Sequence, residues 1–268
     1  MSRLGSAHAI RIQGLGHTYP GHSAPALRDV SFEVARGEVV AVLGPSGAGK
    51  TTLFRCLTQL IAFEQGLVEL AGRRLGELHG RELSLARREV GLIFQQFNLV
   101  RRLTAEQNVL AARLGRVPAW RVVLRRFEPS DRALAQASLA RVGLSDQVRQ
   151  RADRLSGGQQ QRVAIARVLA QQSALVLADE PVSSLDPASA SDVLDTLRGV
   201  ARERGITVLS SLHQVDLAIA FADRIVGLRD GRVVVDAPTS GFGDDDYAII
   251  FGRPRRTANV PPGQATPA

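Results

Sequence analysis

Residues 44–51, Gly44-Pro45-Ser46-Gly47-Ala48-Gly49-Lys50-Thr51, decide the fold class of this chain. They fit the pattern G-x-x-x-x-G-K-[ST] and stand between an apolar, β-branched run at 38–43 and helical spacing at 50–60. Glycines let a backbone wrap closely around phosphate groups, and the amides at the start of a helix point toward them. The alternative is a glycine turn that only joins a strand to a helix. The complete match, in this setting, favours a nucleotide-binding loop.

Lys50 is the only lysine among the 34 lysine and arginine residues of the chain. Arginine supplies positive charge everywhere else, so position 50 requires a compact, flexible ammonium rather than a planar guanidinium. In such a loop the lysine reaches the β- and γ-phosphates, and the hydroxyl of Thr51 can hold Mg²⁺. We therefore predict that the nucleotide is bound by Gly44, Pro45, Ser46, Gly47, Ala48, Gly49, Lys50, Thr51 and Thr52.

Length and composition limit the class of protein. The chain has 268 residues, of which 44% are hydrophobic and 22% charged, which suits one sizeable globular core. A single cysteine, Cys56, excludes a disulfide framework and a cysteine-built zinc site. No apolar run is long enough for a spanning helix, and residues 1–8 lack the apolar core of a signal peptide. We expect a soluble cytoplasmic protein, or one that a partner holds at a membrane.

The net charge of +8 and the isoelectric point of about 11.0 are typical of proteins that bind nucleic acid. However, the arginines are spread along the chain and aromatic residues make up only 4% of it. No basic stretch is interleaved with aromatic residues that could stack on bases. We therefore predict a solvated basic surface and no nucleic-acid partner.

Strand-like and helical segments alternate along most of the chain, which predicts an α/β fold with a mostly parallel sheet. The expected strands lie at 9–13, within 28–43, and at 66–71, 90–94, 174–178 and 206–211, with a hairpin over 224–235 that turns at Asp230-Gly231. The expected helices lie at 50–60, 156–170, 188–204 and 215–222, and in a helical stretch over 98–155 that is broken at Pro118 and Pro129. We predict one domain over 1–252, with a helical subdomain at about 96–158 inserted in it, and a disordered tail at 253–268.

An apolar strand at 174–178 leads into Asp179 and Glu180. Ligands bind at the carboxyl ends of strands in open α/β sheets, which is where these two carboxylates belong. Asp179 can hold the metal, directly or through water, and Glu180 can polarise an attacking water. The alternative is a strand that runs out into a solvated acidic turn. Together with the glycine loop, the pair favours a functional site.

A second pair of glycines opens a helix at Leu155-Ser156-Gly157-Gly158-Gln159. Ser156 and Gln159 have the spacing of a capping box, which explains them without any ligand. Capping does not explain two consecutive glycines, which reduce helix stability but leave bare amides open to an anion. The chain therefore presents two helix starts that suit phosphate.

These features resemble ABC (ATP-binding cassette) ATPases over roughly residues 9–252. The stretch Leu155-Ser156-Gly157-Gly158-Gln159-Gln160-Gln161-Arg162 is similar to the family's signature sequence. The other family elements follow in order, with Gln95 resembling the Q-loop glutamine, Asp186 the D-loop aspartate, His213 the switch histidine and Tyr19 the aromatic residue that stacks on adenine. The resemblance implies a P-loop NTPase with a RecA-like, mostly parallel sheet, a β-rich N-terminal edge and an inserted helical subdomain.

The same resemblance implies a head-to-tail homodimer, with ATP and Mg²⁺ between the glycine loop of one subunit and the signature helix of the other. It assigns roles in hydrolysis to Glu180, His213 and Gln95, and the metal to Thr51, Gln95 and Asp179. The residues that act in trans would be Leu155, Ser156, Gly157, Gly158 and Gln159. The inserted helices would receive a membrane permease subunit that works with a substrate-binding protein. The ATPase would then lie peripherally on the cytoplasmic face of the inner membrane.

A finer resemblance is to the ATP-binding subunit of phosphonate importers. It is carried by residues 94–100, 114–116, 120–121, 150–153, 178–187 and 211–218. Ser183 departs from the alanine of that subfamily. Because such an ATPase never touches its cargo, ABC importers of phosphate, phosphite, amino acids or other small solutes remain alternatives, as does a soluble ABC ATPase that acts on nucleic acid or ribosomes. The Ser156–Gln159 element and His213 speak against a P-loop kinase or GTPase.

Overall fold

The computed structural model describes residues 7–94, 97–115 and 127–255. Its centre is a six-stranded sheet in the order β10-β9-β3-β8-β7-β6. The strands of this sheet are β3 (Val39–Leu43), β6 (Val90–Phe94), β7 (Leu175–Asp179), β8 (Thr207–Ser211), β9 (Arg224–Arg229) and β10 (Arg232–Pro238). All neighbours are parallel except β10, which returns antiparallel to β9. The prediction of a mostly parallel α/β sheet is confirmed.

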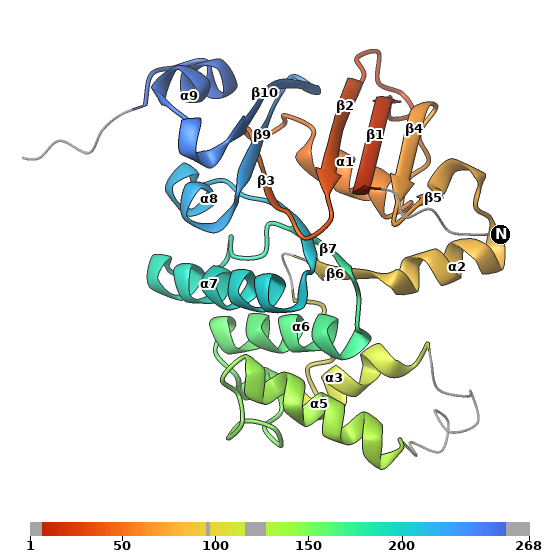
Figure 1. Cartoon of the computed structure of the whole chain (residues 1–268), viewed down its shortest axis with the longest axis vertical. Coiled ribbons are helices and arrows are strands. Elements are labelled where there is room, and N and C mark those ends of the chain that lie inside the picture. Colours follow the sequence, from red (N-terminus) through yellow and green to blue (C-terminus); the bar gives the residue numbers. More distant parts are fainter. Residues whose placement is uncertain (1–6, 95–96, 116–126, 256–268) are drawn as a thin grey trace, which may run out of the picture.

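A four-stranded antiparallel sheet in the order β2-β1-β4-β5 forms the N-terminal edge (Figure 1). Its strands are β1 (His8–His17), β2 (Leu27–Ala35), β4 (Gln65–Leu70) and β5 (Arg73–Arg74). The strand-like run at 28–43 therefore divides into β2 and β3, which belong to different sheets. The break comes at Gly37, whose φ of 77° allows a tight turn that other residues rarely adopt.

Helices cover the sheets and account for most of the predicted helical segments. They are α1 (Lys50–Leu57), α2 (Gly80–Glu89), α3 (Ala105–Leu110), α5 (Pro129–Arg141), α6 (Gly157–Gln171), α7 (Pro187–Arg204), α8 (Val215–Phe221) and α9 (Asp244–Phe251), with 3₁₀ turns at Leu75–Glu77, Ala111–Arg113, Ala152–Arg154 and Thr239–Gly241. Pro129 begins α5 rather than breaking a helix, because the first helical position needs no backbone N–H. Pro118 and most of the expected tail lie outside the described residues.

Helices α2 and α9 were not expected from the sequence. Both helices are short, with 10 and 8 residues, and each buries a single residue, Ala86 in α2 and Ile250 in α9, so the sequence signal for them is weak. The start of α9 has three aspartates, Asp244, Asp245 and Asp246, which favour the positive end of the helix dipole. These aspartates were the sequence signal that could have predicted the start of α9.

Two hydrophobic cores lie on opposite faces of the six-stranded sheet. The alternating side chains of β3 enter both, with Val39, Ala41 and Leu43 in one core and Val40 and Val42 in the other. The first core contains the buried face of α6 and of the helices around it, and the second contains the buried face of α1 and the N-terminal sheet. Figure 1 shows α3 and α5 packed beneath α6, at the end of the molecule away from the N-terminal sheet.

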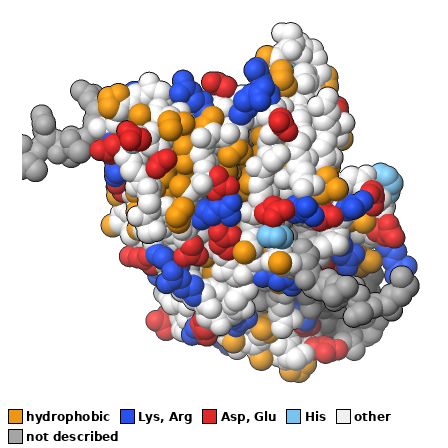
Figure 2. All heavy atoms as spheres, turned by 45° about the horizontal axis from the view of Figure 1, so that its top comes forward, with side chains coloured by type: hydrophobic (Ala, Val, Ile, Leu, Met, Phe, Trp, Pro, Cys, Tyr) orange, Lys and Arg blue, Asp and Glu red, His pale blue; other side chains and the backbone are white. Residues whose placement is uncertain are grey.

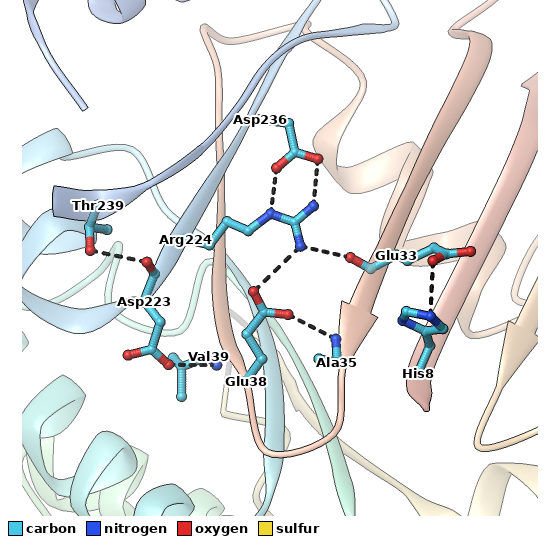
Figure 3. Close-up of polar contacts among 9 residues, drawn as sticks. All are labelled: His8, Glu33, Ala35, Glu38, Val39, Asp223, Arg224, Asp236 and Thr239. Atoms are coloured by element: carbon cyan, nitrogen blue, oxygen red, sulfur yellow. Dashed lines mark hydrogen bonds and ion pairs between the residues drawn. The ribbon is translucent and has the colours of Figure 1, made fainter. Parts of the chain in front are cut away.

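Arg224, on β9, joins the two sheets through a network of polar contacts (Figure 3). Its guanidinium binds both carboxylate oxygens of Asp236, at 2.5 and 2.6 Å, and donates to the carbonyl oxygen of Glu33 on β2 at 3.0 Å. It also contacts Glu38 Oε1 at 3.4 Å, while Glu38 Oε2 accepts from the amide of Ala35 at 2.8 Å. A single arginine thus holds the turn between β2 and β3 against the central sheet.

We predict that Arg224→Ala lowers the free energy of unfolding by about 1–2 kcal/mol, because several charge-assisted hydrogen bonds are lost at a side chain that is only 27% exposed. Chemical denaturation with a reversible two-state fit measures the change. Arg74→Ala is the matched control, since Arg74 also contacts two carboxylates, Glu69 and Glu77, but on the open surface. Equal effects of the two substitutions would contradict the role assigned to Arg224.

Candidate functional site

The glycine loop connects β3 to α1, and its backbone geometry leaves no room for other residues at two positions. A Cβ on Gly44 would lie 2.2 Å from the carbonyl oxygen of Leu228, and one on Gly49 would lie 2.7 Å from that of Ala26. Gly49 also has a φ of 103°, which L-residues with side chains rarely adopt. The loop is therefore fixed in shape by close approach to two neighbouring segments.

Lys50 is the first residue of α1 and is only 4% exposed. Its ammonium donates to the carbonyl oxygens of Gly44 at 2.7 Å and Pro45 at 3.1 Å. Burial lowers the pKa of Lys50, and the nearby carboxylates Glu180 and Asp179 oppose that shift. The loop thus encloses a cation that faces two carboxylates.

One pocket brings much of the glycine loop together with two of the residues predicted to act in hydrolysis. It has a volume of about 240 Å³ and is lined by Ala26, Ser46, Gly47, Ala48, Gly49, Lys50, Thr51, Thr52, Glu180 and His213. The structure therefore places the glycine loop, the second carboxylate and the expected switch histidine around one space. Gly44 and Pro45 lie behind this lining, where their carbonyl groups hold Lys50.

Tyr19 lies beside this pocket rather than in its lining. Its hydroxyl is 3.3 Å from Thr52 Oγ1 and 3.4 Å from Arg55 Nη1, so it contacts the outer face of α1. Its ring meets His17 edge-on, with the ring centroids 4.8 Å apart. Stacking of Tyr19 on adenine stays a prediction.

The acidic end of β7 meets the end of β8. Asp179 accepts a hydrogen bond from the hydroxyl of Ser211 at 2.8 Å, and that hydroxyl also accepts from the backbone amide of Glu180 at 2.8 Å. Burial raises the pKa of Asp179, and the Ser211 hydrogen bond partly opposes the rise. The Glu180 carboxylate lies 2.5 Å from His213 Nε2. Ser211 was missed in the sequence, although Asp179 and Ser211 are register partners in neighbouring parallel strands.

The segment at 155–159 forms the predicted helix start. Ser156 Oγ accepts from the amide of Gln159 at 3.3 Å, and Gln159 Oε1 accepts from the amide of Ser156 at 3.0 Å, so the capping box is confirmed. A Cβ on Gly157 would lie 2.9 Å from Cδ2 of Leu185, a side-chain end that would have to shift. Gly158 has no such constraint, since the nearest atom to its Cβ would be 3.6 Å away. None of Leu155, Ser156, Gly157, Gly158 and Gln159 lines the pocket of the glycine loop.

Asp186 caps the N-terminus of α7, where its Oδ1 accepts from the amide of Ser189 at 3.0 Å. The hydrogen bonds from Ser189 lower the pKa of Asp186. Gln95 lies outside the described residues. The strand before it, β6, ends at Phe94, the register partner of Asp179.

Comparisons with known proteins agree with this arrangement. A sequence profile of the ABC transporter family matches residues 27–183. The chain belongs to the ABC transporter family. The cassette is 48% identical over 246 residues to "Hypophosphite import ATP-binding protein HtxD" of Stutzerimonas stutzeri, covering 92% of this chain and 72% of that protein. It is 44% identical over 245 residues to "Phosphonates import ATP-binding protein PhnC" of Staphylococcus aureus, covering 91% and 95%.

Solved structures share the ABC cassette fold. The dimeric ATP-binding cassette MJ0796, in a post-hydrolysis state bound to ADP and Pi, superposes with a TM-score of 0.75 at 32% identity, over 87% of this chain and 100% of that one. The cassette cbiO1 of Clostridium perfringens, part of the transporter complex cbiONQ, superposes with a TM-score of 0.78 at 25% identity, over 90% and 93%. The expected fold class is therefore confirmed in detail.

The donors available to Mg²⁺ in this ABC cassette are oxygen atoms, as that ion prefers. Thr51 and Asp179 line one further pocket of about 310 Å³ beside the loop. No cluster of three or more acidic, histidine or cysteine side chains suited to a metal occurs among the described residues. Mg²⁺ is usually held by one or two protein oxygens together with phosphate oxygens, and the Thr51 hydroxyl and Asp179 carboxylate are donors of that kind.

Charged side chains of both signs are intermixed on the face of the cassette shown in Figure 2. Several described arginines pair with carboxylates, among them Arg11 with Glu33 at 2.9 Å and Arg113 with Asp131 at 2.8 Å. Within the described ranges, no helix combines the length and the apolar character needed to cross a membrane. The expectation of no nucleic-acid partner stays a prediction.

We predict that Lys50→Ala weakens ATP binding by about a hundredfold or more, because hydrogen bonds to charged phosphates are lost together with the buried cation. Lys50→Arg should fail as well, since the carbonyls of Gly44 and Pro45 enclose a compact ammonium that a planar guanidinium cannot replace. Titration with ATP by calorimetry measures both variants. Arg74→Lys, a distant exchange on the surface, is the control, and wild-type affinity of Lys50→Arg would contradict the argument.

Proposed function

We propose that this chain is the ATP-hydrolysing subunit of an ABC importer for phosphonates or a related phosphorus oxoanion. The observation that carries the hydrolytic part is the pocket in which the glycine loop, Glu180 and His213 meet. Import and the class of solute are supported by the two relatives, both of which are named as import ATP-binding proteins. We infer a single cassette domain over 1–252 with the helical subdomain at about 96–158.

The roles of the residues follow from their chemistry. The buried Lys50 and the loop amides hold the phosphates, and Tyr19 stacks on adenine from the side of α1. Thr51, Asp179 and Gln95 hold Mg²⁺, which neutralises part of the phosphate charge when it is bound. Glu180 takes the proton of the attacking water.

His213 lies within hydrogen-bond distance of Glu180, so it orients that carboxylate and senses the γ-phosphate. This contact holds the Glu180 carboxylate in one direction. Asp186, at the start of α7, belongs to the D-loop and faces the partner subunit in the proposed dimer.

The signature helix acts in trans in this proposal. The start of α6 offers bare amides at Gly158, yet it does not line the pocket of its own glycine loop. A homodimer that turns each α6 toward its partner's nucleotide would use these amides, and the related cassette MJ0796 is dimeric. Helices α3 and α5, packed on α6, are then placed to receive a permease subunit that works with a substrate-binding protein. This arrangement puts the ATPase peripherally on the cytoplasmic face of the membrane.

We predict that Gly158→Asp abolishes dimer formation and hydrolysis while monomeric ATP binding survives, because a carboxylate would face the γ-phosphate of the partner's nucleotide. The fold should tolerate it, since a Cβ at Gly158 finds ordinary contacts and an acidic residue suits a helix start. Light scattering, phosphate release and ATP titration measure the three properties. Gly158→Ala is the control for the added Cβ without the charge.

Mixing Gly158→Asp with Lys50→Ala sharpens the test. In a mixed dimer one site combines both defects, whereas the other combines an intact glycine loop with an intact signature. Phosphate release should return in part on mixing. If Gly158→Asp instead weakened monomeric ATP binding as much as Lys50→Ala does, the signature would act in cis and the head-to-tail dimer would be wrong.

The solute is tested by growth. A bacterial strain without phosphonate uptake receives this chain together with permease and binding-protein genes from the same source, and phosphonate is its sole phosphorus source. We predict growth with the wild-type chain and none with Glu180→Gln, which keeps the size of the side chain but cannot act as a base. Growth on hypophosphite or phosphate but not on phosphonate would replace the proposed solute, and growth on none of them would overturn the whole class.

A further inference from the structure

The hydroxyl of Ser211 lies between the two functional carboxylate residues. It donates to Asp179 Oδ1 and accepts from the backbone amide of Glu180, each at 2.8 Å. The side chain is fully buried at the end of β8 and does not line the pocket of the glycine loop. Ser211 thus uses one oxygen to connect two residues that have different tasks, without reaching the nucleotide itself.

The backbone at Glu180 needs such support because it is strained. Its φ is 49°, in the left-handed region that residues other than glycine, asparagine and aspartate seldom occupy. Ser211 holds the amide of Glu180, and Ser183 holds its carbonyl oxygen through the backbone amide at 3.3 Å and the hydroxyl at 3.2 Å. This conformation directs the Glu180 carboxylate toward the pocket and to within 2.5 Å of His213.

We propose that Ser211 is a positioning residue for hydrolysis, which holds the base Glu180 in its strained conformation and in a fixed relation to Asp179. The inference rests on the proposed function of Glu180. Loss of the hydroxyl leaves the Glu180 amide unsatisfied in a part-buried place, so the backbone relaxes and the carboxylate turns away from the attacking water. Nucleotide binding depends mainly on the glycine loop, so it should change much less than hydrolysis.

The neighbouring Ser210 provides a matched control. It lies on the same strand and is equally buried, but its side chain points to the other face of the sheet. Its hydroxyl has no hydrogen-bond partner among the described residues. Ser210→Ala therefore removes the same atom from the same strand without touching either carboxylate.

Steady-state hydrolysis by the full-length chain tests the proposal. Ser211→Ala should lower kcat roughly tenfold or more, the usual scale for a misplaced catalytic group, with KM for ATP within about threefold of wild type. Ser211→Thr keeps the hydroxyl and should restore most of kcat, whereas Ser211→Cys keeps the volume but donates weakly and should not. Ser210→Ala should leave kcat unchanged. Melting temperatures identify any variant that fails to fold. If Ser211→Ala does not fold, the comparison of Ser211→Thr with Ser211→Cys tests the proposal.

A double-mutant cycle separates positioning from loss of packing. With Glu180→Gln, the orientation of residue 180 no longer matters, so adding Ser211→Ala should change single-turnover phosphate release by no more than about twofold. An equal tenfold loss in both backgrounds would overturn the role of Ser211 but not the proposed function. Wild-type kcat in Ser211→Ala, with Glu180→Gln inactive, would do the same. Wild-type hydrolysis in Glu180→Gln would instead overturn the proposed function.

Discussion

The site depends on a strand that is covered on both faces. β3 sends Val39, Ala41 and Leu43 into one core and Val40 and Val42 into the other, so it cannot shift without disturbing both. It ends at the glycine loop, whose backbone is then confined by two carbonyl groups that approach too closely for any side chain. The enclosed ammonium of Lys50 follows from this confinement. The shape of the glycine loop is therefore a consequence of packing that begins at Val39, five residues before Gly44.

Much of this could be predicted because the relevant signals are local. Strands buried on both faces read as continuous apolar runs, and the glycine loop, Asp179 and Glu180 all follow such runs. The capping box at Ser156 is equally local. The division of 28–43 between two sheets was less accessible, since a tight turn at a glycine looks the same whether the chain stays in one sheet or leaves it. Helices α2 and α9 are short and each buries a single residue, so periodicity was a weak signal for them.

The parts of the site that escaped prediction depend on contacts between strands. Ser211 is one of many serines in the sequence, and its role emerges only when β8 lies beside β7 with Asp179 in register. The left-handed backbone of Glu180 is likewise a tertiary effect, because nothing in the residue type favours it. For Tyr19 the fold places the hydroxyl beside Thr52 and Arg55 of α1, while stacking of its ring on adenine stays a prediction. A side chain's surroundings are fixed by the whole fold, and the solute of a transporter is encoded in other subunits altogether.

The two cores on either side of the central sheet separately support the two glycine-rich helix starts, those of α1 and α6. Helix α1, behind the glycine loop, rests in one core, and α6, behind Gly158, rests in the other. A substitution in one core that leaves β3 in place therefore need not loosen the other core. In the proposed dimer, the glycine loop binds the subunit's own nucleotide and the start of α6 contacts the partner's nucleotide. Substitutions can therefore change one of these functions without changing the other. Such a molecule can change its affinity for a partner subunit and still bind ATP.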